Sequence, residues 1–311
     1  MLRRSLLVSA VIGFCTSSLF GGAVMFGGLG GHGPGSNSTN DGSLVTIDQT
    51  TGDVTVVGHP AGVARLTGIT FDSSGALFGS TLGSIPFPPP PAKSTSSLIQ
   101  INPATGAIES TIGSITDGAG GAAISIADLA AQPGTGTLFG IRSPVDGLGG
   151  QGNLYTINKS TGVAKLVGAT GRFFASIAFA PNGTLYMTGA DLGPNGAEVN
   201  PQLLTLDPAN AKVKTSVTTD GFFGALGVRP GDGAIFAGNG DGSQIFTLNA
   251  GTGAATALSH NTGTNFVGDL DFRPATNAIP LPPALWSGII GMIALVGLAS
   301  ARMLRSAGTG Y

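Results

Sequence analysis

The sequence predicts an all-β protein built from repeated antiparallel units, and three observations support this prediction. First, a pattern of two apolar residues three positions apart, followed by Asp or Asn, begins at Leu44, Leu98, Leu154, Leu203 and Ile245. Second, these starts lie 54, 56, 49 and 42 residues apart, which is the period of a repeat architecture. Third, 53 of the 311 residues are glycine and only 10% are charged, a composition typical of turn-dense β structure.

Each repeat contains four short strand signals, which are clearest in the third repeat, at residues 154–158, 164–168, 176–180 and 184–188. Apolar residues alternate there with small or polar ones, which is the period of a strand. Turns such as Asn158–Gly162 and Pro181–Gly183 join them, with Asx and glycine chemistry suited to tight hairpins. Units of about fifty residues with four antiparallel strands resemble the blades of a β-propeller.

The two ends of the repeat array predict a closed ring. The fifth repeat stops after its third strand, at residues 269–274. Residues 23–28 have the character of the fourth strands at 77–79, 138–140 and 235–237. An N-terminal strand at this place would complete the last blade and remove an exposed sheet edge. We therefore expect five four-stranded blades over residues 24–274; the alternatives are an open β-solenoid and a six-bladed ring with one degenerate blade.

The N-terminus predicts export. Residues 1–23 have the form of a signal peptide, with basic Arg3 and Arg4, an apolar stretch at 6–14 and small residues before the expected cleavage site. Cys15 is the only cysteine of the chain and raises lipoprotein attachment as an alternative. Bulky Phe14 stands directly before it, where a small residue is expected, which disfavours that alternative. A mature chain without cysteine fits an exported bacterial protein.

The C-terminus predicts a membrane anchor. A Pro-rich linker at 275–283 precedes a predicted transmembrane helix with a basic end at 284–305, and a short tail follows at 306–311. The apolar part, 284–301, reaches roughly 27 Å as a helix, close to the thickness of a bilayer core. Trp286 would lie at the outer interface, and Arg302 and Arg305 on the cytoplasmic side.

This tail resembles the PEP-CTERM family of sorting signals, in the variant whose motif is Val-Pro-Leu-Pro. Pro280, Leu281 and Pro282 match that motif, Ile279 replaces the usual Val, and Trp286 falls early in the helix. The resemblance implies a Gram-negative bacterium in which an exosortase-type enzyme removes the tail and passes the protein to the cell surface or the exopolysaccharide matrix. The basic cluster is sparser than usual, and six residues follow Arg305. A plain single-span anchor is the alternative.

The repeats themselves resemble secreted bacterial propellers with YncE-like or quinoprotein-like blades. This resemblance covers most of the predicted mature chain and implies a blade geometry more than a ligand. The Trp-rich blade signature of quinone-cofactor dehydrogenases is absent, because the only tryptophan, Trp286, lies in the tail.

Catalytic motifs are scarce in the chain. His32, His59 and His260 have no metal-ligand spacing and are expected in surface loops. No serine lies in a Gly-x-Ser-x-Gly elbow, and no glycine-rich phosphate loop joins a strand to a helix. We therefore predict no catalytic residue and no cofactor, with calcium as the one candidate metal.

The candidate cation site is a set of equivalent positions on the third strands, which we call the inner column: Gly68, Asp128, Ser176, Ala225 and Asp269. Residues there can face the mouth of the central channel, where Asp128, Asp269 and nearby Asp271 would offer oxygen ligands to calcium. Alternatively, these acids bond backbone amides or cap turns. A weaker candidate is the loop Asn239-x-Asp241-x-Ser243, which lacks the distal Glu of a calcium loop.

Charge narrows the choice of partner. Without its four terminal arginines the chain keeps 10 basic residues against 16 acidic ones, about −6, which argues against nucleic acid. We expect an exported binding or structural module with exopolysaccharide or envelope proteins as partners. The competing prediction is a metal-dependent propeller hydrolase or lyase with its site at the channel mouth.

Overall fold

The computed structural model describes residues 22–30, 39–83, 94–142, 152–193, 198–239, 243–263 and 265–273. Residues 1–21 of the predicted signal peptide, the motif Ile279–Pro282, Trp286, the two tail arginines and the predicted transmembrane helix lie outside these residues. Within the described ranges, no helix is long and apolar enough to cross a bilayer. Residues 23–274 form one compact unit, and the description below concerns that unit.

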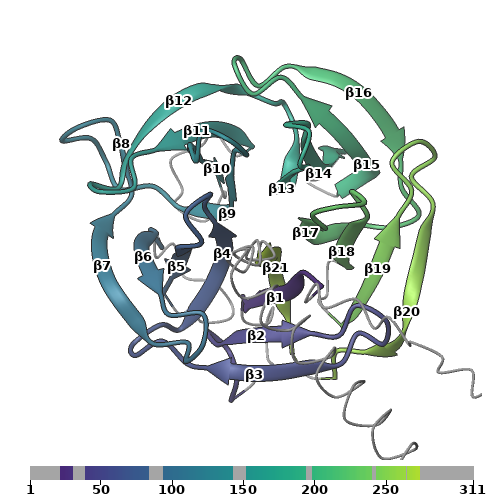
Figure 1. The fold of residues 1–311 in the computed structure, drawn as a ribbon. Helices are drawn as coiled ribbons and strands as arrows, with labels where there is room; N and C mark the ends of the chain where they lie inside the picture. The colour runs from purple at the N-terminus through teal and green to yellow at the C-terminus, as the bar shows by residue number, and fades with distance from the viewer. Residues whose placement is uncertain are drawn as a thin grey trace, which may run out of the picture. The chain divides into compact units, whose positions relative to one another are not determined.

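Five sheets surround a common axis, so residues 23–274 form a five-bladed β-propeller (Figure 1). From the axis outward, the blades are β21 (Val267–Arg273), β1 (Val24–Leu29), β2 (Leu44–Ile47) and β3 (Val54–Gly58); β4 (Arg65–Phe71), β5 (Leu77–Leu82), β6 (Ser97–Ile101) and β7 (Ile108–Ser114); β9 (Ile126–Ala131), β10 (Leu138–Arg142), β11 (Asn153–Ile157) and β12 (Val163–Ala169); β13 (Phe173–Phe179), β14 (Leu185–Leu192), β15 (Glu198–Leu206) and β16 (Val213–Thr218); and β17 (Phe223–Val228), β18 (Ile235–Asn239), β19 (Gln244–Leu248) and β20 (Ala255–Asn261). Neighbouring strands of each four-stranded blade are antiparallel. A further strand of two residues, β8 (Thr116–Asp117), pairs in parallel with β12 at the outer edge of one blade.

The sequence repeat and the structural blade are out of phase. The first two strands of the third repeat, β11 and β12, are the outer strands of one blade. Its third and fourth strands, β13 and β14, are the inner strands of the next blade. One repeat therefore spans two blades, and the equation of each repeat with one blade was wrong, although the number of blades was right.

The N-terminal strand closes the ring as predicted. β1 pairs with β21 in an antiparallel register from Val24↔Arg273 to Gly28↔Asp269, and on its other side with β2. One strand from the end of the chain and three from its beginning thus form a single blade. This pairing rules out the open solenoid, and the five sheets rule out the six-bladed ring.

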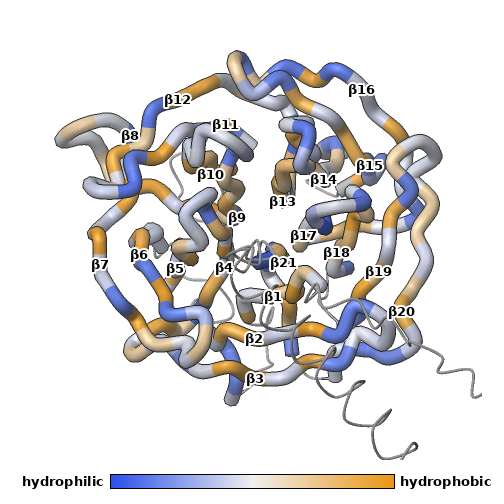
Figure 2. The backbone as a smooth tube through the Cα atoms, viewed as in Figure 1, coloured by the Kyte–Doolittle hydropathy of each residue, from blue (hydrophilic) through white to orange (hydrophobic). Residues whose placement is uncertain are grey.

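The hydrophobic core lies between neighbouring blades. The inner strands are almost fully buried, whereas the outer strands β7, β16 and β20 are largely exposed, and the tube in Figure 2 shows the corresponding mixture of polar and apolar residues outside. Edge-to-face phenylalanine pairs join adjacent blades, with ring centroids 5.2 Å apart for Phe26–Phe71 and 5.3 Å for Phe139–Phe179. Because each core cluster needs two blades, we expect the ring to fold cooperatively.

The end of each outer strand packs on the outer turn of the next blade. Turn residues Gly52, Gly106, Gly162, Ala211 and Gly253 all have positive φ. A Cβ at Gly253 would lie 1.9 Å from the carbonyl oxygen of Thr218, at the end of β16. In the turn that has alanine at this position instead of glycine, Ala211 faces Gly168, which has no side chain. The glycine of the repeat motif therefore serves both the turn and the contact between blades.

The two ends of the inner strands define two faces of the ring. β5 ends beside the start of β4, with Leu82 opposite Arg65, and the other second strands end likewise beside the starts of their inner strands. The long connections to the third strands therefore leave the ring at this end, which we call the loop face. Short turns such as Asp72–Gly75 occupy the opposite turn face. Val24 and Arg273 are paired there, so both ends of the propeller lie on the turn face.

Candidate functional site

The inner column lies on the strands nearest the axis, as predicted, but its acids are buried. Asp128 on β9 is 1% exposed and Asp269 on β21 is 0% exposed. Ser176 and Ala225 in the same column are also 0% exposed. The column therefore packs into the junctions between blades and does not open onto a solvent-filled mouth.

Asp269 and Asp271 connect the closing blade to the next blade. One oxygen of Asp269 accepts a hydrogen bond from the amide of Ile69 on β4, at 2.5 Å, and the other accepts from its neighbour Leu270. Asp271 repeats this arrangement one step along, with the amides of Phe71 and Phe272. Each carboxylate thus satisfies one amide of its own strand and one of the adjacent blade.

Asp128 performs the same task two blades further on, between β9 and β13. Its Oδ2 accepts from the amide of Ile177 on β13, at 2.7 Å, and from the hydroxyl of Ser176, while Oδ1 accepts from Leu129. Thr70 supplies the corresponding acceptor between β4 and β9, because its hydroxyl receives the amide of Ala131 at 3.0 Å. Thr188 donates to the carbonyl oxygen of Phe223 at the junction that follows β14.

These bonds have a common physical cause. The innermost strand of each blade is a sheet edge, and the amides that point away from the sheet along this edge have no partner in a neighbouring strand. Burying such an amide without an acceptor costs about 1–3 kcal/mol, and a carboxylate is a strong acceptor. The alternative that the acids bond backbone amides therefore describes their role.

Burial strongly perturbs the same acids. Desolvation raises the pKa of Asp128 to about 7, against the hydrogen bonds that it accepts. Desolvation and then the charge of Asp128 hold the pKa of Asp269 well above its ordinary value. Desolvation of its carboxyl group raises the pKa of Asp271 to about 6. These shifts have a structural explanation, so they do not by themselves indicate catalysis.

The donor set does not form a calcium site. Among the described residues, no group of three or more His, Cys, Asp or Glu side chains has an arrangement suited to a metal ion. Calcium prefers six to eight oxygen ligands, and a cation at Asp128 or Asp269 would compete with the amides already bound to them. We therefore assign no metal to the inner column.

The second candidate loop is a hairpin cap where it is described. Asn239 Oδ1 accepts from the amide of Gln244 at 2.9 Å, and its Nδ2 donates to the Ser243 hydroxyl at 3.3 Å. Asp241 lies outside the described residues. Asn239 thus has a local structural role that requires no ion.

Two of the three histidines are placed by the structure, and both form polar pairs near the ring's closing blade. His59 Nδ1 lies 3.2 Å from the hydroxyl of Ser43, which is only 2% exposed and so cannot meet a substrate in this form. His260 Nδ1 lies 2.9 Å from Asp53 Oδ1 at an exposed position between β20 and β3. His32 lies outside the described residues.

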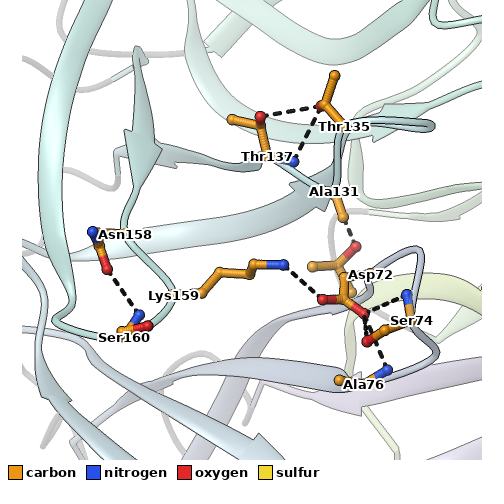
Figure 3. Close-up of polar contacts among 10 residues, drawn as sticks. Asp72, Ser74, Ala76, Ala131, Thr135, Thr137, Asn158, Lys159 and Ser160 are labelled. Atoms are coloured by element: carbon orange, nitrogen blue, oxygen red, sulfur yellow. Dashed lines mark hydrogen bonds and ion pairs between the residues drawn. The ribbon is translucent and has the colours of Figure 1, made fainter.

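Sequence reasoning missed a polar contact between the second and third blades on the turn face. Lys159, in the turn between β11 and β12, forms a 2.7 Å ion pair with Asp72 and lies 5.6 Å above the ring of Phe78. Asp72 also accepts hydrogen bonds from Ser74 and the amide of Ala76 (Figure 3). The equivalent positions Gln49 and Arg229 make a 2.9 Å contact at the closing blade. The sequence feature that could have predicted these contacts is the long polar side chain, Gln49 or Lys159, that directly follows Asp48 or Asn158 in the turn between the two outer strands.

Comparison with known proteins identifies the fold but no family. No protein-family model and no curated protein matches the sequence. A chain of the nidogen/laminin complex superposes with a TM-score of 0.51 at 12% identity, over 82% of this chain and 99% of that one. A Bacteroides caccae protein of unknown function (TM-score 0.46, 12% identity, 81% of this chain and 99% of that one) and a Xanthomonas campestris gluconolactonase (0.44, 13%, 73% and 71%) are also similar. The likeness is one of fold.

Proposed function

We propose that the protein is an exported propeller, displayed at the cell surface or in the extracellular matrix, that binds a matrix or envelope component through its loop face. The topology of the ring is the observation that carries this proposal. Val24 and Arg273, the two ends of the propeller, are paired on the turn face, and the long connections leave at the opposite face. A tether joined to Arg273 leaves the loop face free for a partner.

The tail supplies the placement in this proposal. Ile279–Pro282, Trp286, Arg302 and Arg305 act as a PEP-CTERM-like signal that an exosortase-type enzyme recognises. The segment 284–305 holds the chain in the membrane until processing releases the propeller. The negative charge of the exported part, about −6, favours neutral polysaccharide or basic protein surfaces over nucleic acid.

The first experiment measures the mass and location of the native protein in its own cells. We expect a product that begins near residue 24, ends near Pro282 and is recovered from the surface or matrix fraction. An intact tail in the inner-membrane fraction would remove the sorting step and leave an anchored propeller. A chain that keeps residues 1–23 and stays in the cytoplasm would overturn export and display together.

The second experiment tests the loop face. In a Cys15→Ser background, Ala61→Cys and Ser73→Cys place single thiols at exposed positions beyond the two ends of β4, on the loop and turn faces respectively. A bulky thiol-reactive polymer at position 61 should block binding to purified exopolysaccharide, whereas the same polymer at position 73 should leave binding intact. Equal binding by both conjugates would contradict the assignment of the loop face.

A further inference from the structure

Two buried carboxyl groups meet near the axis of the ring across an intervening blade. Asp128 on β9 and Asp269 on β21 hydrogen bond to each other, although β4 packs against both of their strands. The inner-column residue of β4 is Gly68, where a Cβ would lie 2.9 Å from Asp128 Cα and 2.8 Å from the amide nitrogen of Leu129. The missing side chain lets the backbone of β9 approach β4 closely, beside Ile69, whose amide binds Asp269.

A carboxyl-to-carboxyl hydrogen bond requires a proton, because two carboxylates offer only acceptors. Full ionisation would also place two like charges in a site where the residues are 1% and 0% exposed. One shared proton removes both problems. The acids then act together with their amide bonds to Ile69 on β4 and Ile177 on β13, so the pair connects four of the five blades.

The surrounding strands offer little charge to replace that proton. β1, β5, β13 and β17 contain no ionisable residue, and the neighbouring acid Asp271 is engaged with the amides of Phe71 and Phe272. Arg65 at the start of β4 donates to the carbonyl oxygen of Gly30, and Arg142 at the end of β10 donates to Tyr155. Arg273 is exposed at the far end of β21. The proton is therefore the local means of neutralising the pair.

We propose that the proton shared by Asp128 and Asp269 is a pH-sensitive lock that holds the blades together at the axis. With the proton in place, the pair bridges β9 and β21. When the proton is lost, two buried negative charges repel each other across Gly68, and the inner ends of the blades are held less firmly. This inference concerns the ring itself and does not depend on the proposed function.

The sign of the pH effect follows from the direction of the shifts. The pKa values of both acids are raised in the folded protein, whereas an unfolded aspartate titrates near its ordinary value of about 3.9. The folded state thus retains a proton that the unfolded chain has released. The stabilisation is full below the unfolded pKa and is lost as the pH rises through the folded values. The folding equilibrium constant should fall about tenfold per pH unit for each retained proton.

The test is urea unfolding of the full chain and of Asp128→Asn between about pH 5 and about pH 8. The amide group of the asparagine donates permanently to Asp269. The slope of the free energy of unfolding against pH should therefore decrease in this variant by the amount that one retained proton contributes. Asp232→Asn is the control, because Arg229 holds the pKa of Asp232 at about 2, outside this range. An unchanged slope in Asp128→Asn would overturn the proposal, as would an equal change in the control.

A measurement on the wild-type protein keeps the proposal falsifiable if Asp128→Asn fails to fold. Infrared spectra of protein labelled with carbon-13 aspartate should show the carbonyl stretch of a protonated carboxyl group at about pH 6.5, where exposed aspartates are ionised. The band should disappear on unfolding at the same pH. Absence of a protonated aspartate band from the folded protein would show that the pair holds no proton and would overturn the lock.

Discussion

The carboxylate of Asp271 on β21 accepts a hydrogen bond of 2.6 Å from the amide of Phe71 on β4, 200 residues earlier in the chain. Asp269 makes the same kind of bond to Ile69 two residues away. On its other side, β21 is paired along its length with β1. The last strand of the propeller is therefore bonded to two segments from the beginning of the chain, by its main chain and by its side chains.

Asp271→Ala should destabilise the ring by about 1–3 kcal/mol, because the amide of Phe71 then lies at a blade junction without its acceptor. The free energy of unfolding in urea measures the effect. Asp232→Ala is the control, since its ion pair with Arg229 is largely exposed and should contribute about 1 kcal/mol or less. Equal losses in the two variants would mean that the junction bond is not specially stabilising.

Gly253→Ala should destabilise the fifth blade by more than about 1 kcal/mol. Gly253 has φ +76, and an added Cβ would lie 1.9 Å from the Thr218 carbonyl oxygen, so both the turn and the blade contact are strained. Gly251→Ala in the same turn has only Asn249 Oδ1 nearby, at 3.5 Å, and should change stability by about 0.5 kcal/mol or less. Thermal unfolding of the two variants compares them directly; a similar fall in Tm would contradict the contact.

Asp72→Ala should cost more stability than Lys159→Met. The methionine keeps apolar contact with Phe78 and removes only a partly exposed ion pair, worth about 1 kcal/mol or less, whereas the alanine also leaves the amides of Ser74 and Ala76 without their acceptor. Urea unfolding at neutral pH measures both variants. The reverse order would show that the ion pair, and not the turn, is the main role of Asp72.

Low pH should reduce the difference in stability between the wild-type protein and Asp72→Ala. Burial of Asp72 opposes ionisation, but Lys159 and Ser74 outweigh it and hold the pKa of Asp72 below its ordinary value. The contribution of Asp72 is therefore present above the unfolded pKa of about 3.9 and is lost as the pH falls through the lower folded value. The free energies of unfolding of the wild-type protein and Asp72→Ala should converge as the pH falls below the unfolded value. A constant difference at low pH would contradict the charge-dependent part of the contact.

Met25→Ala should destabilise the closing blade by about 2–5 kcal/mol, because Met25 is 0% exposed in the core that joins β1 to Val45 and Phe272. Val24→Ala, one residue earlier and 45% exposed, is the matched control and should have a small effect. Denaturant unfolding and gel filtration together measure the loss and detect rings that open and associate. Equal effects would mean that β1 does not close the ring through its buried side.

The local structure of the repeats could be predicted because its cause is local. Alternation of apolar and small residues predicted the strands, and the Asn158–Gly162 and Pro181–Gly183 turns predicted the hairpins between them. The unpaired last strand expected at residues 269–274 predicted a partner at residues 23–28, since a buried sheet edge needs its hydrogen bonds satisfied. The inner column was also correctly placed on the strands nearest the axis.

What the sequence by itself determined is thus the strand pattern, the turns, the number of blades and the strand that closes the ring. Only the tertiary structure decided that a repeat spans two blades, because sheet pairing depends on which strands meet after the chain has crossed between blades. It also decided that Asp128, Asp269 and Asp271 bind amides of the next blade and do not line an open mouth. Those amides belong to Ile69, Phe71 and Ile177, which are distant in sequence, so only the closed ring brings each acid to its partner.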